Sequence, residues 1–138
     1  MSYDISIVKC KGTRPAAPFE LQANAVCILG PASEVRRNVS SVFVGTDWSR
    51  PAWGTYDGDG FSIEFNMGEE PILDLTLHLR GGGNAIAMIT GMARQFGWYA
   101  IDCQTAEFIE SNGQVAEGLT EWQAFRSQVA REHRAEEE

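Results

Sequence analysis

Polar side chains that could bind a partner or carry out acid–base chemistry alternate with apolar ones along two neighbouring segments of the chain. The polar positions include Glu64 in the first segment and Asp74, His78 and Arg80 in the second. Successive side chains of a strand point to opposite faces of a sheet, so pairing the two segments gathers these four residues on one face. The sequence predicts a polar patch there, which is a protein-binding surface, an acid–base site or an ordinary solvated face.

The register of the two predicted strands decides which of these side chains are neighbours. Carboxylates that lie directly opposite each other destabilise a strand pair. A register that pairs Glu64 with Thr76 keeps Glu64 away from Asp74. The same register places Ser62 opposite His78 and Asn66 opposite Asp74, and we adopt it as the prediction.

The residues of the patch make a weak case for catalysis. A general base needs a nucleophile or a polarised substrate atom beside it, and His78 is the histidine expected in the ordered body, because His133 falls in the polar tail. Cys103 follows Asp102, but without a positioned histidine it is more simply a buried strand residue. No cysteine and histidine spacing matches a zinc site, and the acidic turn at residues 57–60 lacks the length and distal glutamate of a calcium loop. The sequence predicts no enzyme activity, no metal and no cofactor.

A glycine-rich turn follows the second segment and comprises Gly81, Gly82, Gly83 and Asn84. Glycine turns at helix N-termini expose N–H groups that bind anions, which makes this turn a candidate anion-binding site. Neither nucleotide-binding glycine motif is present, however, and close packing of a strand against a helix also requires glycine. We favour the structural interpretation, which predicts that Gly82→Ala destabilises the fold if the φ angle of Gly82 is positive.

Two tryptophans, Trp48 and Trp53, flank a proline close to the acidic turn that carries Asp57 and Asp59. Exposed tryptophan beside acidic residues is typical of binding hot spots in protein interfaces. Tryptophan is more often largely buried, so the alternative is that both rings fold back into the core. The sequence leaves both alternatives open.

The composition is that of an ordinary soluble globular protein, with 43% hydrophobic and 22% charged residues. The net charge of −8 argues against nucleic acid as a partner, because binding phosphates needs a basic face, and it favours a basic protein partner. Cys10, Cys27 and Cys103 are predicted to be reduced thiols. No secretory signal or membrane-spanning run is recognisable, so we expect a cytoplasmic protein.

Hydrophobic periodicity predicts an α+β fold, a single antiparallel or mixed sheet with helices packed on one face. The whole chain, residues 1–138, is predicted to be one domain with a frayed acidic tail from residue 132 onward. A hairpin is expected about the turn at residues 57–60. The predicted strands are Tyr3–Cys10, Trp53–Tyr56, Phe61–Met67, Ile72–Arg80, Trp98–Cys103 and Ala106–Ile109. The predicted helices begin at Gly30-Pro31, at Ala85 and near Leu119.

From the region of Gly30 to Glu110 the chain resembles a family of small bacterial proteins with the pattern tDWs…wG…fsiEfn.G…lh.rGGG…gW.a.D…gefi. The matching stretches are Thr46–Gly54, Ser62–Gly68 and Leu75–Glu110. The family resembles the immunity proteins of polymorphic toxin systems. The resemblance implies a stoichiometric protein that neutralises a toxin by binding it. The alternative is a small-molecule or regulatory binding domain that uses the open sheet face or the glycine turn.

Overall fold

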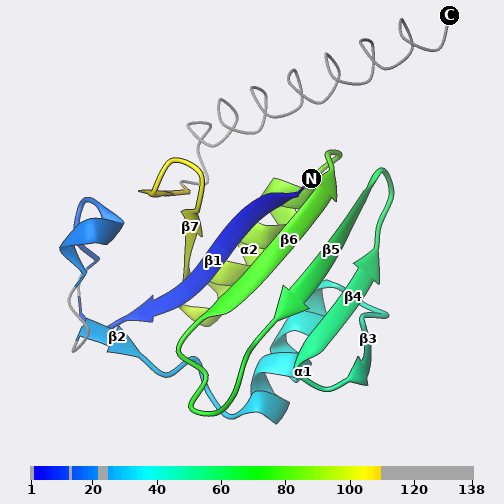
Figure 1. Ribbon diagram of the computed structural model, residues 1–138, viewed down its shortest axis with the longest axis horizontal. Helices are drawn as coiled ribbons and strands as arrows, with labels where there is room; N and C mark the ends of the chain where they lie inside the picture. Colours follow the sequence, from blue (N-terminus) through cyan, green and yellow to red (C-terminus); the bar gives the residue numbers. More distant parts are fainter. Residues whose placement is uncertain (1, 13, 22–24, 110–138) are drawn as a thin grey trace, which may run out of the picture.

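A computed structural model of the chain describes residues 2–12, 14–21 and 25–109 (Figure 1). The helix predicted near Leu119 and the tail predicted from residue 132 lie outside the described residues. Within the described part, no helix is both long enough and apolar enough to cross a membrane.

The fold is α+β, as predicted, and its described residues form one open antiparallel sheet of 8 strands. The strand order is β3-β4-β5-β6-β1-β7-β8, and β2 pairs with the end of β1. The strands are β1 (Tyr3–Cys10), β2 (Val26–Cys27), β3 (Asp47–Arg50), β4 (Trp53–Asp57), β5 (Phe61–Asn66), β6 (Leu75–Gly81), β7 (Tyr99–Asp102) and β8 (Glu107–Phe108). The helices are α1 (Ala32–Val42), α2 (Ala85–Phe96) and the short 3-10 helix η1 (Pro18–Glu20).

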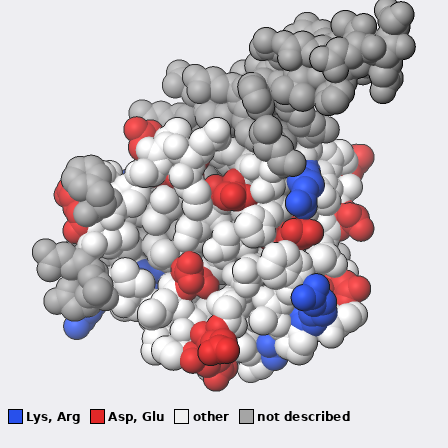
Figure 2. Space-filling model, in the orientation of Figure 1, with Lys and Arg blue, Asp and Glu red and all other residues white. Residues whose placement is uncertain are grey.

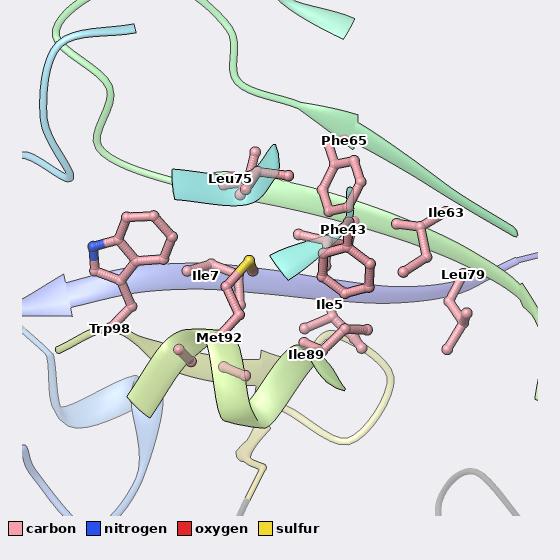
Figure 3. Packing of buried hydrophobic residues seen from close by; sticks show 14 of the residues in the cluster. Ile5, Ile7, Phe43, Ile63, Phe65, Leu75, Leu79, Ile89, Met92 and Trp98 are labelled. Carbon is pink, nitrogen blue, oxygen red and sulfur yellow. The ribbon is translucent and has the colours of Figure 1, made fainter. Parts of the chain in front are cut away.

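Both α-helices pack on the same face of the sheet, and the opposite face is called the open face below (Figure 1). Alternate strand positions point toward the helices and form the core. They include Tyr3, Ile5 and Ile7 of β1, Phe61, Ile63 and Phe65 of β5, and Leu75, Leu77 and Leu79 of β6. Figure 3 shows Ile89 and Met92 of α2 facing Ile5 and Ile7, with Phe43 beside Phe65.

Strand β1 lies in the middle of the sheet, between β6 and β7. Its register places Ile5 opposite Leu77 on one side and opposite Asp102 on the other. The period-2 pattern of Tyr3–Cys10 predicts this strand and its buried face. The pattern carries no information about the neighbours of the strand, which lie far away in the sequence.

Strand β6 begins three residues later than the sequence predicts. Ile72 is buried and forms a bridge with Gly30. The alternation of leucines in the sequence predicts that Leu73 points inward with Leu75, but Leu73 is 47% exposed. Asp74 precedes the strand and is exposed. The alternation breaks because residues 71–74 lie alongside the segment that precedes α1. Regular pairing with β5 therefore starts only at Thr76.

The start of α1 is held by a side chain from a distant loop. Pro31 occupies the N-cap position, where it has no side-chain hydrogen-bonding group. The Ala32 N–H instead donates to Glu70 Oε1 at 2.7 Å. Glu70 therefore satisfies a free N–H of the helix and places a negative charge at its positive end.

Replacing Glu70 with alanine is expected to lower the free energy of unfolding by about 1 kcal/mol, because Ala32 loses its acceptor. Glu69→Ala removes the same charge from the adjacent position and should change the free energy of unfolding by less than about 0.5 kcal/mol. Urea unfolding of the two variants measures the difference. Equal losses would show that Glu70 acts through general charge rather than as a cap.

Candidate functional site

The open face brings together three of the four residues that the sequence predicts for the polar patch. Glu64 lies opposite His78, and Ser62 lies opposite Arg80. The predicted Glu64–Thr76 register is therefore wrong by two residues, although the faces are right, because a slip of two preserves the alternation. Asp74 is not part of the patch, since it lies beyond the paired part of β6.

His78 is oriented by a carboxylate that sequence reasoning missed. Asp4 of β1 lies directly opposite His78, and its Oδ1 is 2.8 Å from His78 Nδ1. Ser2 Oγ donates to the same Asp4 oxygen at 2.6 Å. Partial burial acts to raise the pKa of Asp4, but the hydrogen bonds from Ser2 and His78 and the charges of His78 and Arg80 outweigh it and lower that pKa. Asp4 is therefore ionised and holds the imidazole in a fixed orientation.

Trp53 lies over the open face and stacks on the His78 ring. The two ring centroids are 5.9 Å apart at an interplanar angle of 22°. The guanidinium carbon of Arg50 lies 5.9 Å from the centroid of the Trp53 ring. Arg50, Trp53, His78 and Asp4 thus form a continuous row across the sheet, called the stacked row below.

Glu64 lies beside the stacked row and contacts Arg80. The Arg80 Nη1 to Glu64 Oε1 distance is 3.5 Å, and the two side chains are 49% and 33% exposed. An ion pair with this exposure is screened by water and contributes little to stability. It leaves both groups accessible on the open face.

The two tryptophans face opposite sides of the sheet. The sequence offered two alternatives, exposure at an interface or burial in the core, and neither holds for both rings. Trp48 points toward the helices, where its Nε1 donates to Ser40 Oγ at 2.9 Å and its ring lies 6.2 Å from that of Phe65. Trp53 points to the open face. The cause is a shift in the β3–β4 register between Asp47 and Arg50, an irregularity that no local sequence signal indicates.

The acidic hairpin turn and the glycine turn pack against each other at one end of the sheet (Figure 1). The Gly82 N–H donates to the Gly60 carbonyl oxygen at 3.1 Å. Positive φ angles occur at Gly81 (91°) and Gly83 (58°) and not at Gly82, so the condition set for a destabilising Gly82→Ala substitution is met at its two neighbours instead. Asn84 occupies the N-cap position of α2 without a side-chain cap hydrogen bond. This geometry favours the packing role of the turn over an anion site.

The two ends of the open face differ in exposure. Asp57 and Asp59 are exposed on the hairpin at the β4–β5 end. At the β7–β8 end the guanidinium of Arg14 lies 4.4 Å from the ring centroid of Phe108, which is 8% exposed. The loop that carries Arg14 therefore covers that end, and the accessible polar surface lies over β3, β4, β5, β6 and β1.

The open face is weakly acidic. Asp4, Asp47, Asp57 and Glu64 lie on it by their strand pairing, together with Arg50 and Arg80. Figure 2 shows this face, on which acidic side chains are spread among uncharged atoms and along the rim, and basic ones are fewer.

Asp102 and Cys103 are the other residues whose side chains could carry out chemistry. Asp102 is buried, accepts a hydrogen bond from the Tyr3 hydroxyl, and accepts a second from the Gln104 N–H at 2.8 Å. Cys103 follows β7 and is exposed, so the prediction of a buried strand residue is wrong. Partial burial of its thiol and the nearby Asp4 and Asp102 charges raise the pKa of Cys103, which keeps it a thiol and lowers its reactivity. All three cysteines are free. Among the described residues no group of three or more metal-binding side chains lies together.

No family model, no curated protein and no solved structure matches this chain. The resemblance to immunity proteins therefore stays a prediction from the sequence.

Proposed function

We propose that the protein is a cytoplasmic binding protein that acts stoichiometrically through its open face. More specifically, we propose that it is an immunity protein that neutralises a cognate bacterial toxin by direct binding. The immunity role rests on the sequence resemblance. The geometry of the open face supports protein binding rather than catalysis.

The observation that carries the proposal is the stacked row. Trp53 is partly buried on a sheet face, and the Asp4–His78 pair fixes its orientation by stacking. Aromatic and arginine side chains dominate the energetics of protein interfaces, and a pre-ordered side chain loses little entropy on binding.

His78 does not on its own support an enzyme. Its Nδ1 is held by Asp4, which is the arrangement of a general base. A nucleophile or a bound substrate atom must also lie at Nε2, and among the described residues no hydroxyl or thiol hydrogen-bonds to that atom. We therefore assign the Asp4–His78 pair to positioning Trp53.

Charge supports a basic partner. The chain carries a net charge of −8, and Asp57 and Asp59 extend the acidity to the rim of the open face. Complementary charge speeds the encounter of two proteins and disfavours wrong partners. We infer that these rim residues steer a basic protein toward the stacked row.

The proposal is tested by capture and neutralisation. The tagged chain and its Trp53→Ala variant are exposed to extract from the native cells, and each captured protein is then expressed alone and together with the chain. We expect a basic protein that forms an equimolar complex with the wild type, is lost with Trp53→Ala, and arrests growth only when expressed alone. A captured partner that is harmless when expressed alone would contradict the immunity function. Retention of a small molecule in place of a protein would favour the alternative, a small-molecule or regulatory binding domain.

A further inference from the structure

We propose that the open face recognises arginine side chains of its partner, with Trp53 as the stacking surface and Glu64 as the carboxylate. This inference rests on the proposed function, because it names the chemistry of the partner that the same surface would bind. It assigns a chemical class of ligand to the site.

The chain itself shows that both positions accept a guanidinium group. Arg50 lies 5.9 Å from the centroid of the Trp53 ring, and Arg80 lies 3.5 Å from Glu64. Both arginines are exposed, and the Arg80 charge also acts on Asp4. They occupy the places that arginines of a partner would take.

Hydrogen-bonding groups of the site also remain available. His78 Nδ1 is taken by Asp4, but among the described residues His78 Nε2 has no partner, and when Nδ1–H donates to Asp4 the Nε2 of a neutral ring can accept from a guanidinium N–H. Glu64 has one oxygen at 3.5 Å from Arg80, which leaves the other free for a second contact. A guanidinium fits this set better than an ammonium does, because it is planar, stacks on aromatic rings and binds carboxylates through two parallel hydrogen bonds.

Exchange of an internal arginine for one from a partner preserves the charge balance of the face. The internal contacts are exposed and screened by water, whereas the same contacts inside an interface are desolvated and stronger. Arg50 and Arg80 are therefore competitors for the site. Their removal should strengthen the binding of an external guanidinium, which is the opposite of the result expected if they contact the partner themselves.

The test uses a tri-arginine peptide with blocked ends as the probe and the tri-lysine peptide of equal charge as its control. The full chain is titrated, and binding is followed by the NMR signal of the Trp53 indole N–H, which the spectrum of Trp53→Phe identifies. We expect the arginine peptide to bind at least about three-fold more tightly than the lysine peptide. Glu64→Gln, followed by the same signal, and Trp53→Leu, followed by the backbone amide signals of the open face, should each weaken arginine binding about three-fold or more.

The decisive comparison is between two variants that each lose one positive charge, at different positions. Arg80→Gln should strengthen arginine-peptide binding about three-fold, since it frees Glu64. Arg37→Gln removes an exposed charge from α1, on the other side of the sheet, and should leave the binding unchanged. A dispersed amide spectrum for each variant confirms that it is folded.

Equal binding of the two peptides, or equal strengthening by Arg80→Gln and Arg37→Gln, would overturn the proposal, since charge alone would then explain the binding. Weaker binding by Arg80→Gln would overturn it as well. These failures are separate from a failure of the proposed function. A captured toxin that requires Trp53 but presents no arginine to it contradicts the inference and leaves the immunity function intact.

Discussion

Replacing Gly81 with alanine is expected to lower the free energy of unfolding by about 3 kcal/mol or more, from a strained backbone and an overpacked contact together. Gly81 has a φ angle of 91°, which a residue with a Cβ adopts only at a cost. The added Cβ would lie 2.3 Å from the Gly60 carbonyl oxygen and 2.8 Å from the Phe61 Cα. Both atoms belong to the backbone of the neighbouring turn, so neither can move aside alone.

Gly91→Ala is the matched control. Gly91 is an exposed residue inside α2, and an added Cβ would meet nothing within 4 Å. Because alanine favours the helix, this variant should gain about 0.5–1 kcal/mol. Urea unfolding measures both variants. A Gly81→Ala protein as stable as the wild type would contradict the packing role of the glycine turn and would restore the anion-site interpretation.

The second large effect concerns the buried contact between Tyr3 and Asp102. Burial first, and then the hydrogen bond to Asp102 and its negative charge, raise the pKa of Tyr3 well above its ordinary value of 10.0. A raised pKa in the folded state contributes stability that is present below pH 10 and lost as the pH rises, because only the unfolded chain then releases the proton. We expect the free energy of unfolding to fall by about 1.4 kcal/mol per pH unit above pH 10 from this group.

Tyr3→Phe separates this contribution from the rest. At pH 7 the variant should lose about 1–3 kcal/mol, because Asp102 stays buried without its hydroxyl donor. Above pH 10 its stability should fall less steeply than that of the wild type. Gly91→Ala, which removes no hydroxyl, should keep the wild-type slope. The same slope in Tyr3→Phe as in the wild type would contradict the assignment.

The elements with strong local patterns could be predicted from the sequence. Alternation gave β1 its bounds, and the helical spacing from Ala85 to Phe96 matches α2. Gly97 ends that helix with a φ angle of 71°, as a left-handed cap should. These features depend on residues close together in the chain, where side-chain period and glycine chemistry decide the conformation.

The composition of the open face depended on contacts that local patterns do not carry. Asp4 was missed because nothing near it indicates that β1 lies beside β6. Trp48 and Trp53 were treated alike because the register shift in β3 depends on the pairing with β4. Asp74 was included because the alternation of leucines begins at Leu73, before the strand starts at Leu75.

The alternation of polar residues was nevertheless sufficient to place Glu64, His78 and Arg80 on one face. A register error of two residues leaves the faces unchanged, so the patch survived an incorrect pairing. What the sequence could not supply was the order within the patch. The stacked row becomes visible only when β1 and β4 are placed on either side of β5 and β6.

The claim that the open face is the binding surface is tested most directly by the dissociation constant of the complex with the captured partner. Trp53→Ala should raise that constant by at least about 30-fold, the loss typical of a central hot-spot residue. Gln95→Ala, at an exposed position of α2 on the other side of the sheet, should change it less than about two-fold. An unchanged constant for Trp53→Ala together with a large loss for Gln95→Ala would place the partner on the helices and contradict the account.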